Sequence, residues 1–142
     1  MLRDVKITVI GESDSGNPFE APDRTVTNAV GSLEDSGEHI LVSFEETDEE
    51  SGQVLKTTLR FNGDMLEVTR RGLLESVLTF KRDERWESAY ETPYGSFLMA
   101  TRTGHFEKVE NEDKINLHVG YDMEINNDFV SKNKTFIEIE FI

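Results

Sequence analysis

Hydrophobic and polar residues alternate with a period of two along almost the whole chain. The alternation runs over residues 6–10, 40–44, 55–61, 65–71, 74–80, 86–90, 97–103, 115–125 and 135–141, and more weakly over 24–33. Because successive side chains of a β-strand point to opposite faces, this pattern predicts strands with one buried face. Residues 73–80 carry leucines at helical spacing, but the segment is short and its residues favour a strand. The chain is therefore predicted to be all-β.

Turn signals separate these segments at hairpin spacing. Asn62-Gly63 is a strong two-residue hairpin signal. In Thr92-Pro93-Tyr94-Gly95, the proline presets the negative φ of the second turn position and glycine suits the fourth. With no repeat and no domain boundary, residues 1–142 are predicted to form one antiparallel up-and-down barrel of about eight strands. Residues 11–22 are predicted to be a loop, and the pairing of region 11–38 stays open.

An ordered set of short motifs resembles a known family. The motifs are Phe44-Glu45-Glu46-Thr47 followed by Gly52, Arg70-Arg71-Gly72, Leu78-Thr79-Phe80, Tyr90-Glu91-Thr92-Pro93-Tyr94-Gly95, Thr101-Arg102-Thr103, and Tyr121. From about residue 40 to its end, the chain resembles the bacterial domain-of-unknown-function family DUF1934, the YwiB-like proteins. The resemblance implies a calycin-like, lipocalin-type β-barrel. It brings no catalytic residues to this sequence.

Charge and composition limit the choice of partners. The 142 residues include 15 Lys and Arg against 29 Asp and Glu, a net charge of −14. Such a field repels nucleic acid and anionic membranes, so neither is an expected partner. The surplus is expected to keep the surface hydrated, with a cationic partner as the alternative. With no cysteine, disulfides and thiol chemistry are excluded. No signal peptide or apolar span is recognised, so a cytoplasmic protein is expected.

Patterns typical of catalysis or metal binding fail on inspection. His39, His105 and His118 lie far apart in the sequence, without a carboxylate or second histidine at ligand spacing. The alternating acids from Asp122 to Asp128 lack the glycine and the final glutamate of a calcium loop. No catalytic residue, no metal site and no cofactor are therefore predicted.

Two charged residues are candidates for a ligand site inside the barrel. Arg70 follows Leu66 and Val68 at period two, and Glu46 follows Phe44 in the same way. A charge directed into a barrel needs a partner, because burying it alone is costly. One interpretation is an Arg70–Glu46 ion pair, or Arg70 emerging at the rim. The other is that Arg70 anchors an anionic ligand through a two-pronged hydrogen bond.

Three aromatic residues complete the candidate ligand-binding set. Trp86, Tyr90 and Tyr121 fall on faces predicted to point toward the core, either for packing or for stacking on a ligand. The leading interpretation is a barrel that binds a small, partly apolar and anionic molecule. The alternatives are a protein-interaction or homodimer module with a filled barrel and, behind both, an enzyme with its site inside the barrel.

Overall fold

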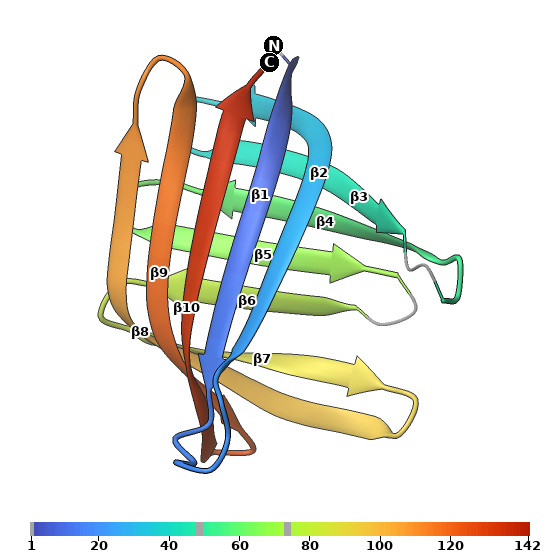
Figure 1. Cartoon of the computed structure of the whole chain (residues 1–142), viewed down its shortest axis with the longest axis vertical. Helices are drawn as coiled ribbons and strands as arrows, with labels where there is room; N and C mark the ends of the chain where they lie inside the picture. The colour runs from blue at the N-terminus through green and yellow to red at the C-terminus, as the bar shows by residue number, and fades with distance from the viewer. Residues whose placement is uncertain (1, 48–49, 73–74) are drawn as a thin grey trace.

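Ten antiparallel strands make up the computed structural model, which describes residues 2–47, 50–72 and 75–142 (Figure 1). No helix occurs in these ranges. The strands are β1 (Leu2–Asp14), β2 (Asp23–Asp35), β3 (Ile40–Thr47), β4 (Val54–Phe61), β5 (Met65–Arg71), β6 (Ser76–Lys81), β7 (Arg85–Thr92), β8 (Gly95–Glu110), β9 (Lys114–Ile125) and β10 (Asp128–Phe141). The all-β prediction is confirmed. The number of strands is ten rather than about eight, because every alternating segment forms a strand of its own. Residue 74, the predicted start of one strand, lies outside the described ranges.

Except for β6 and β7, each strand pairs with the next one in the sequence, and the first strand pairs with the last. The order across the sheet is β6-β5-β4-β3-β2-β1-β10-β9-β8-β7. Strands β1, β2, β8, β9 and β10 run along the long axis of the molecule, and β3 to β6 cross behind them (Figure 1). The sheet thus curls back on itself into a nearly closed up-and-down barrel.

The barrel fails to close completely between β6 and the pair β7–β8, and this line is called the seam below. Among the residues that the structure describes, a single bridge pairs Glu75 with Glu91 there. The hydroxyl of Thr101 donates to the carbonyl oxygen of Thr79, and the Arg82 guanidinium donates to the carbonyl oxygen of Phe106 at 2.6 Å. Scattered hydrogen bonds therefore replace a continuous ladder along the seam.

The core lies between the two crossing layers. Its largest fully buried side chains are Phe61, Ile7, Leu59, Leu66, Ile115, Leu117 and Ile139. Along β9, burial alternates through Val119, as predicted, and then stops alternating. Beyond Val119 both faces of β9 are half-buried. On the outer face Arg85 covers part of Glu124, with its Nε 3.2 Å from the carboxylate.

Two predicted hairpins are present, with different turn chemistry. Asn62 caps its own turn, since its side-chain oxygen accepts hydrogen bonds from the backbone N–H groups of Asp64 and Met65. Thr92 pairs with Gly95 across the second turn. There the threonine hydroxyl donates to the Gly95 carbonyl oxygen at 2.9 Å, and Gly95 has a positive φ of 127°. Glycine is the residue that adopts this backbone conformation without strain.

Gly31 marks the corner at which β2 leaves one layer and joins the other. It pairs with Val5 of β1 on one side and with Phe44 of β3 on the other. A Cβ added to Gly31 would lie 2.1 Å from the carbonyl oxygen of Ser43. The two layers therefore approach each other at a position where only a hydrogen can point inward.

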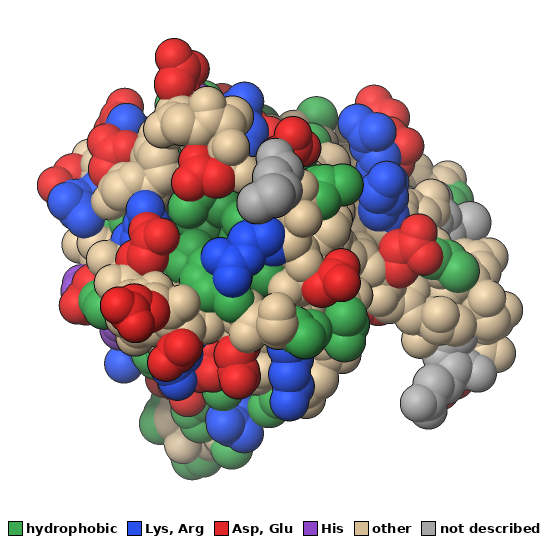
Figure 2. Space-filling model, turned by 90° about the horizontal axis from the view of Figure 1, so that it is seen from above, with side chains coloured by type: hydrophobic (Ala, Val, Ile, Leu, Met, Phe, Trp, Pro, Cys, Tyr) green, Lys and Arg blue, Asp and Glu red, His purple; other side chains and the backbone are tan. Residues whose placement is uncertain are grey.

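The surface is acidic but mixed in sign. Seen along the long axis from the end that carries both termini, Asp and Glu side chains are spread among Lys and Arg around a central hydrophobic area (Figure 2). None of the described residues belongs to a helix long and apolar enough to cross a membrane.

Candidate functional site

A cavity of about 120 Å³ lies inside the barrel. Most of its wall is apolar, and its polar members come from β2 to β6, β9 and β10. The lining residues are Val9, Thr27, Phe44, Glu46, Thr57, Leu59, Leu66, Val68, Arg70, Ser76, Leu78, Phe80, Val119, Tyr121, Thr135 and Ile137. Water occupies about 30 Å³ in the liquid, so the space accommodates a few waters or a small organic molecule.

The strand register explains how polar groups reach this cavity. Phe44 pairs with Thr57, Thr57 with Arg70, and Arg70 with Ser76. Directly paired residues of antiparallel strands point to the same face, so these four side chains form one row across β3 to β6. The row crosses the inside of the barrel.

Arg70 lines the cavity from its mouth. It shares the inner face with Leu66 and Val68, as predicted, but its side chain is exposed rather than buried. The predicted ion pair with Glu46 is absent among the described residues, although the half-buried Glu46 also lines the cavity. The ion-pair interpretation is therefore wrong, and the rim position is the one observed. The guanidinium keeps its hydrogen-bonding capacity free of any carboxylate that the structure describes.

Tyr121 is the one predicted aromatic residue that reaches the cavity. Its ring packs against Phe80 with ring centroids 4.5 Å apart. Burial raises the pKa of its phenol, while a hydrogen bond to Thr135 and the charge of Arg70 act in the opposite direction. The Arg70 charge is thus felt at the Tyr121 hydroxyl, which links the mouth of the cavity to its interior.

Thr57 supplies a polar group that was not among the charged and aromatic residues predicted from the sequence. It is only 2% exposed, and its hydroxyl oxygen has no hydrogen-bond partner in the described structure. Buried hydroxyls are normally satisfied, and leaving one unpaired costs about 1–3 kcal/mol. The sequence did contain a signal, because Thr57 interrupts the otherwise apolar face of Leu55, Leu59 and Phe61.

Trp86 and Tyr90 do not line the cavity; Tyr90 is half-buried, whereas Trp86 is exposed, contrary to the prediction that it points toward the core. Trp86 is 42% exposed, and neither side chain lines the cavity. Both lie on β7, which Figure 1 shows with β8 below the crossing strands β3 to β6. Along β7, Ser88 and Tyr90 are half-buried while Glu87 and Ala89 are exposed, so Trp86 is the exception to the predicted alternation.

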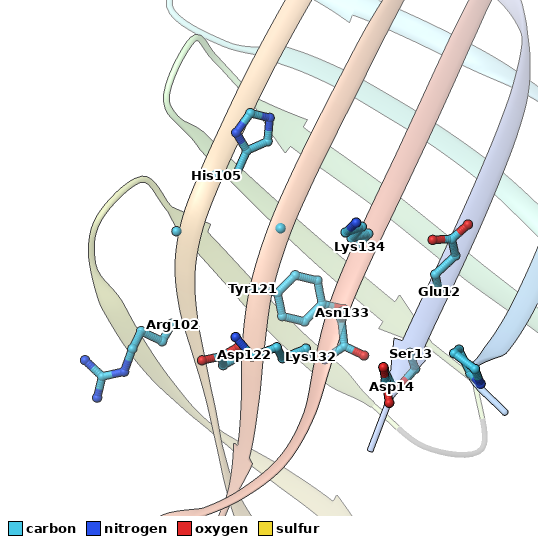
Figure 3. A pocket seen from close by; sticks show the side chains of 13 residues that line it. Glu12, Ser13, Asp14, Arg102, His105, Tyr121, Asp122, Lys132, Asn133 and Lys134 are labelled. Atoms are coloured by element: carbon cyan, nitrogen blue, oxygen red, sulfur yellow. The ribbon is translucent and has the colours of Figure 1, made fainter. Parts of the chain in front are cut away.

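A larger hollow of about 670 Å³ lies on the outer face of β1, β8, β9 and β10 (Figure 3). Its side chains alternate in sign across the strands, since Asp14 pairs with Lys132, Lys132 with Asp122, and Asp122 with Arg102. Opposite charges opposite one another stabilise the sheet itself. The hollow is more open to solvent than the interior cavity, so the interior cavity is the better candidate for holding a small molecule.

The histidines are not all far apart, which corrects the expectation from sequence spacing. The rings of His105 and His118 have centroids 4.6 Å apart. One ligating atom from each ring and one from the Glu107 carboxylate all lie within 4.8 Å of one another. Burial, followed by the charge of His105, lowers the pKa of His118. Antiparallel pairing of β8 with β9 brings these residues together, and linear spacing does not reveal that pairing.

The fold and the cavity define the class as a small, nearly closed antiparallel β-barrel with a polar group at the mouth of its interior. The family described as "Domain of unknown function (DUF1934)" matches residues 7–137, so the chain belongs to this family, as the motifs predicted. The crystal structure of the ywiB protein from Bacillus subtilis is similar, with a TM-score of 0.83 and 16% sequence identity. The alignment covers 99% of this chain and 93% of that one. At this identity the likeness establishes the fold. No curated protein matches the chain.

Proposed function

We propose that the protein is a cytoplasmic, calycin-like barrel that binds a small, partly apolar anion in its interior cavity. The observation that carries the proposal is the pair formed by Arg70 and Thr57. One is a cation at the mouth without a carboxylate partner among the described residues, and the other is a buried hydroxyl without a partner. Both groups belong to the same cross-strand row and line the same cavity.

The chemistry of the wall suits such a ligand. A guanidinium binds a carboxylate or phosphate through two parallel hydrogen bonds. Val68, Leu78 and Phe44 would contact an apolar portion, and the hydroxyl of Thr57, which is paired with Arg70 on the same face, would donate to the same anionic group. Glu46 is the single carboxylate among the described lining residues. Ligand sites of this kind are mostly apolar with a few placed polar groups.

The volume limits the size of the ligand. Pockets for drug-sized molecules span roughly 300–1,000 Å³, and this cavity holds about 120 Å³. A short-chain carboxylate fits that space, and butyrate is the probe of choice. Native mass spectrometry of the protein purified from its own host would identify a natural ligand.

A matched pair of arginine variants tests the proposal. Arg70 and Arg71 are adjacent in β5, so their side chains point to opposite faces, and only Arg70 lines the cavity. Butyrate is expected to shift backbone amide signals of cavity residues in wild type and in Arg71→Met, and to lose this effect in Arg70→Met. Equal loss in both variants would show that general charge, not the site, attracts the anion. Butyrate without effect on wild type would contradict the binding of a short-chain carboxylate.

Thr57→Val separates binding from stability. Valine has the shape of threonine without its hydroxyl, so the free protein should become more stable by about 1 kcal/mol while binding weakens. Urea unfolding measures the first effect and butyrate titration the second. A variant that is less stable and binds equally well would mean that the hydroxyl already has a partner.

The second candidate function is a homodimer module, favoured by exposed aromatic side chains on the β7–β8 hairpin. Trp86 is 42% exposed, Phe97 38% and Tyr94 95%. Exposed apolar patches of this kind are typical of association surfaces. Sedimentation of wild type and Trp86→Ser at increasing concentration tests it. A monomer at every concentration in both would rule it out.

A further inference from the structure

Two histidines and a glutamate converge on the outer face of the barrel, away from the interior cavity. His105 and Glu107 are two residues apart on β8, so they point to the same side of the strand. His118 on β9 pairs directly with Glu107. One nitrogen from each imidazole and one carboxylate oxygen lie within 4.8 Å of one another.

The three side chains occupy three corners of a rectangle on the sheet. The fourth corner is Gly120, which pairs with His105 and has no side chain. A Cβ at Gly120 would approach the His105 Cβ to 3.3 Å. The glycine thus gives the His105 ring room to lean toward His118, and it leaves the fourth corner open to solvent.

A β-bulge directs His105 to this face. The register shifts between Thr103 and His105, so Gly104 is the extra residue in β8. Thr103 and Phe106 are both buried, which places His105 on the outside together with Glu107. Bulges commonly redirect a side chain in this way, and they occur beside functional sites.

The neighbours of the cluster restrain one ring and leave the others accessible. His118 stacks on Phe136 with centroids 4.3 Å apart, which limits its rotation. The side chains of His105 and Glu107 are 52% and 57% exposed. An ion from solution can therefore reach all three ligating atoms without unfolding any part of the strand pair.

We propose that His105, Glu107 and His118 form a binding site for a divalent transition-metal ion, with zinc as the type case. Imidazole nitrogen and carboxylate oxygen are ordinary zinc ligands, and three protein ligands with one open position are a common zinc arrangement. Imidazoles select such ions over the hard cations Ca²⁺ and Mg²⁺, which prefer oxygen ligands. The open corner beside Gly120 faces the outer hollow of Figure 3, which His105 and Gly120 both line. Water or an anionic group would complete the coordination there. This site is independent of anion binding in the cavity.

The test is a titration of the full chain with zinc chloride by isothermal calorimetry. Wild type should bind one zinc ion per chain, and Glu107→Gln and His118→Gln should each weaken binding by roughly tenfold or more. His39→Gln is the matched control, because His39 lies at the turn between β2 and β3 and its loss should change nothing. Glu107 is exposed, so its variant removes a ligand without disturbing the packing of His118 on Phe136. Excess Mg²⁺ or Ca²⁺ should not displace the zinc.

Absorption of the cobalt-substituted protein gives a second readout, since the intensity of its visible d–d bands reports the coordination geometry of the bound ion. The bands should persist in His39→Gln and disappear in His118→Gln. The proposal is overturned if wild type binds no zinc, if all three variants bind it equally, or if Mg²⁺ displaces it. Equal binding by all variants would assign the ion to the general acidity of the surface.

Discussion

Replacing Gly31 by alanine should destabilise the protein more than any other glycine-to-alanine change at ordinary φ. The added Cβ would lie 2.1 Å from the Ser43 carbonyl oxygen, 2.9 Å from the Phe44 Cβ and 3.0 Å from the Ile7 Cδ1. The nearest of these atoms belongs to the backbone of β3, so it cannot swing away as a flexible side chain can. Relief requires the two strands to separate by roughly 1 Å or more, because ordinary carbon contacts begin near 3.4 Å.

The magnitude follows from the contacts that would be disturbed. Overpacking a close-fitting core typically costs about 1–3 kcal/mol. Separating β2 from β3 at this corner also weakens ladder hydrogen bonds, each worth about 1 kcal/mol. We expect a loss of about 3 kcal/mol in the free energy of unfolding. For a domain of this size that corresponds to a fall of about 10 °C in melting temperature.

Thermal unfolding followed by circular dichroism measures this effect, with Gly63→Ala as the control. Gly63 also lies beside a strand, but a Cβ there would meet nothing within 4 Å. Its replacement should leave the melting temperature nearly unchanged, or raise it slightly through the unfolded chain. A melting temperature for Gly31→Ala within about 2 °C of wild type, or an equal loss in both variants, would contradict a steric clash at Gly31.

Three further predictions concern the turn, the buried tyrosine and the core. Gly95→Val should lower the free energy of unfolding by about 1–3 kcal/mol, because a φ of 127° strains a β-branched residue even though the space around Gly95 is open. Gly104→Val, which has equal room and no positive φ, should cost less in the same urea unfolding experiment. Equal costs in the two variants would contradict backbone strain as the cause. Because burial raises the pKa of Tyr121, its phenol should ionise above pH 10. Ultraviolet titration of wild type and of Tyr121→Phe identifies the contribution of this residue. As pH rises, the unfolded chain loses the phenolic proton before the folded chain does, so the contribution of Tyr121 to the free energy of unfolding is present below about pH 10 and is lost above it. Ionisation of Tyr121 at or below pH 10 would contradict its burial. Leu59→Ala should lower the free energy of unfolding in urea by about 3 kcal/mol, because it enlarges the cavity. Leu41→Ala, at a site 37% exposed, should cost under about 1 kcal/mol. Similar losses in the two variants would argue against a packed interior.

The sequence predicts strands and tight turns well because both depend on local chemistry. Alternation around Leu59 and Leu117 reflects one-sided burial, and the Thr92–Gly95 turn depends on residues within four positions. The inward direction of the Arg70 side chain follows from the same period of two. Whether Arg70 forms an ion pair with Glu46 does not follow from it, because the distance between them depends on how the whole barrel curls.

Two features of the site lie beyond local patterns. Counting by two from Phe97 through Thr103 would carry His105 to the inner face, and the bulge at Gly104 reverses its direction. Trp86 alternates as a core residue does, yet it is exposed even though its cross-strand partner Thr101 is buried. Both differences are set by tertiary geometry, which a single sequence does not encode at any fixed spacing.

The seam has a consequence for behaviour at high concentration. A curled sheet with two ends has two edge strands, here β6 and β7, and free edges are templates for pairing with other chains. In this fold the two edges face each other, and the bridge at Glu75 and Glu91 with the Arg82 hydrogen bond keeps them together. Opening the seam would expose two unpaired edges at once. Resistance to aggregation therefore depends on the few contacts that hold β6 against β7 and β8, more than on the large core.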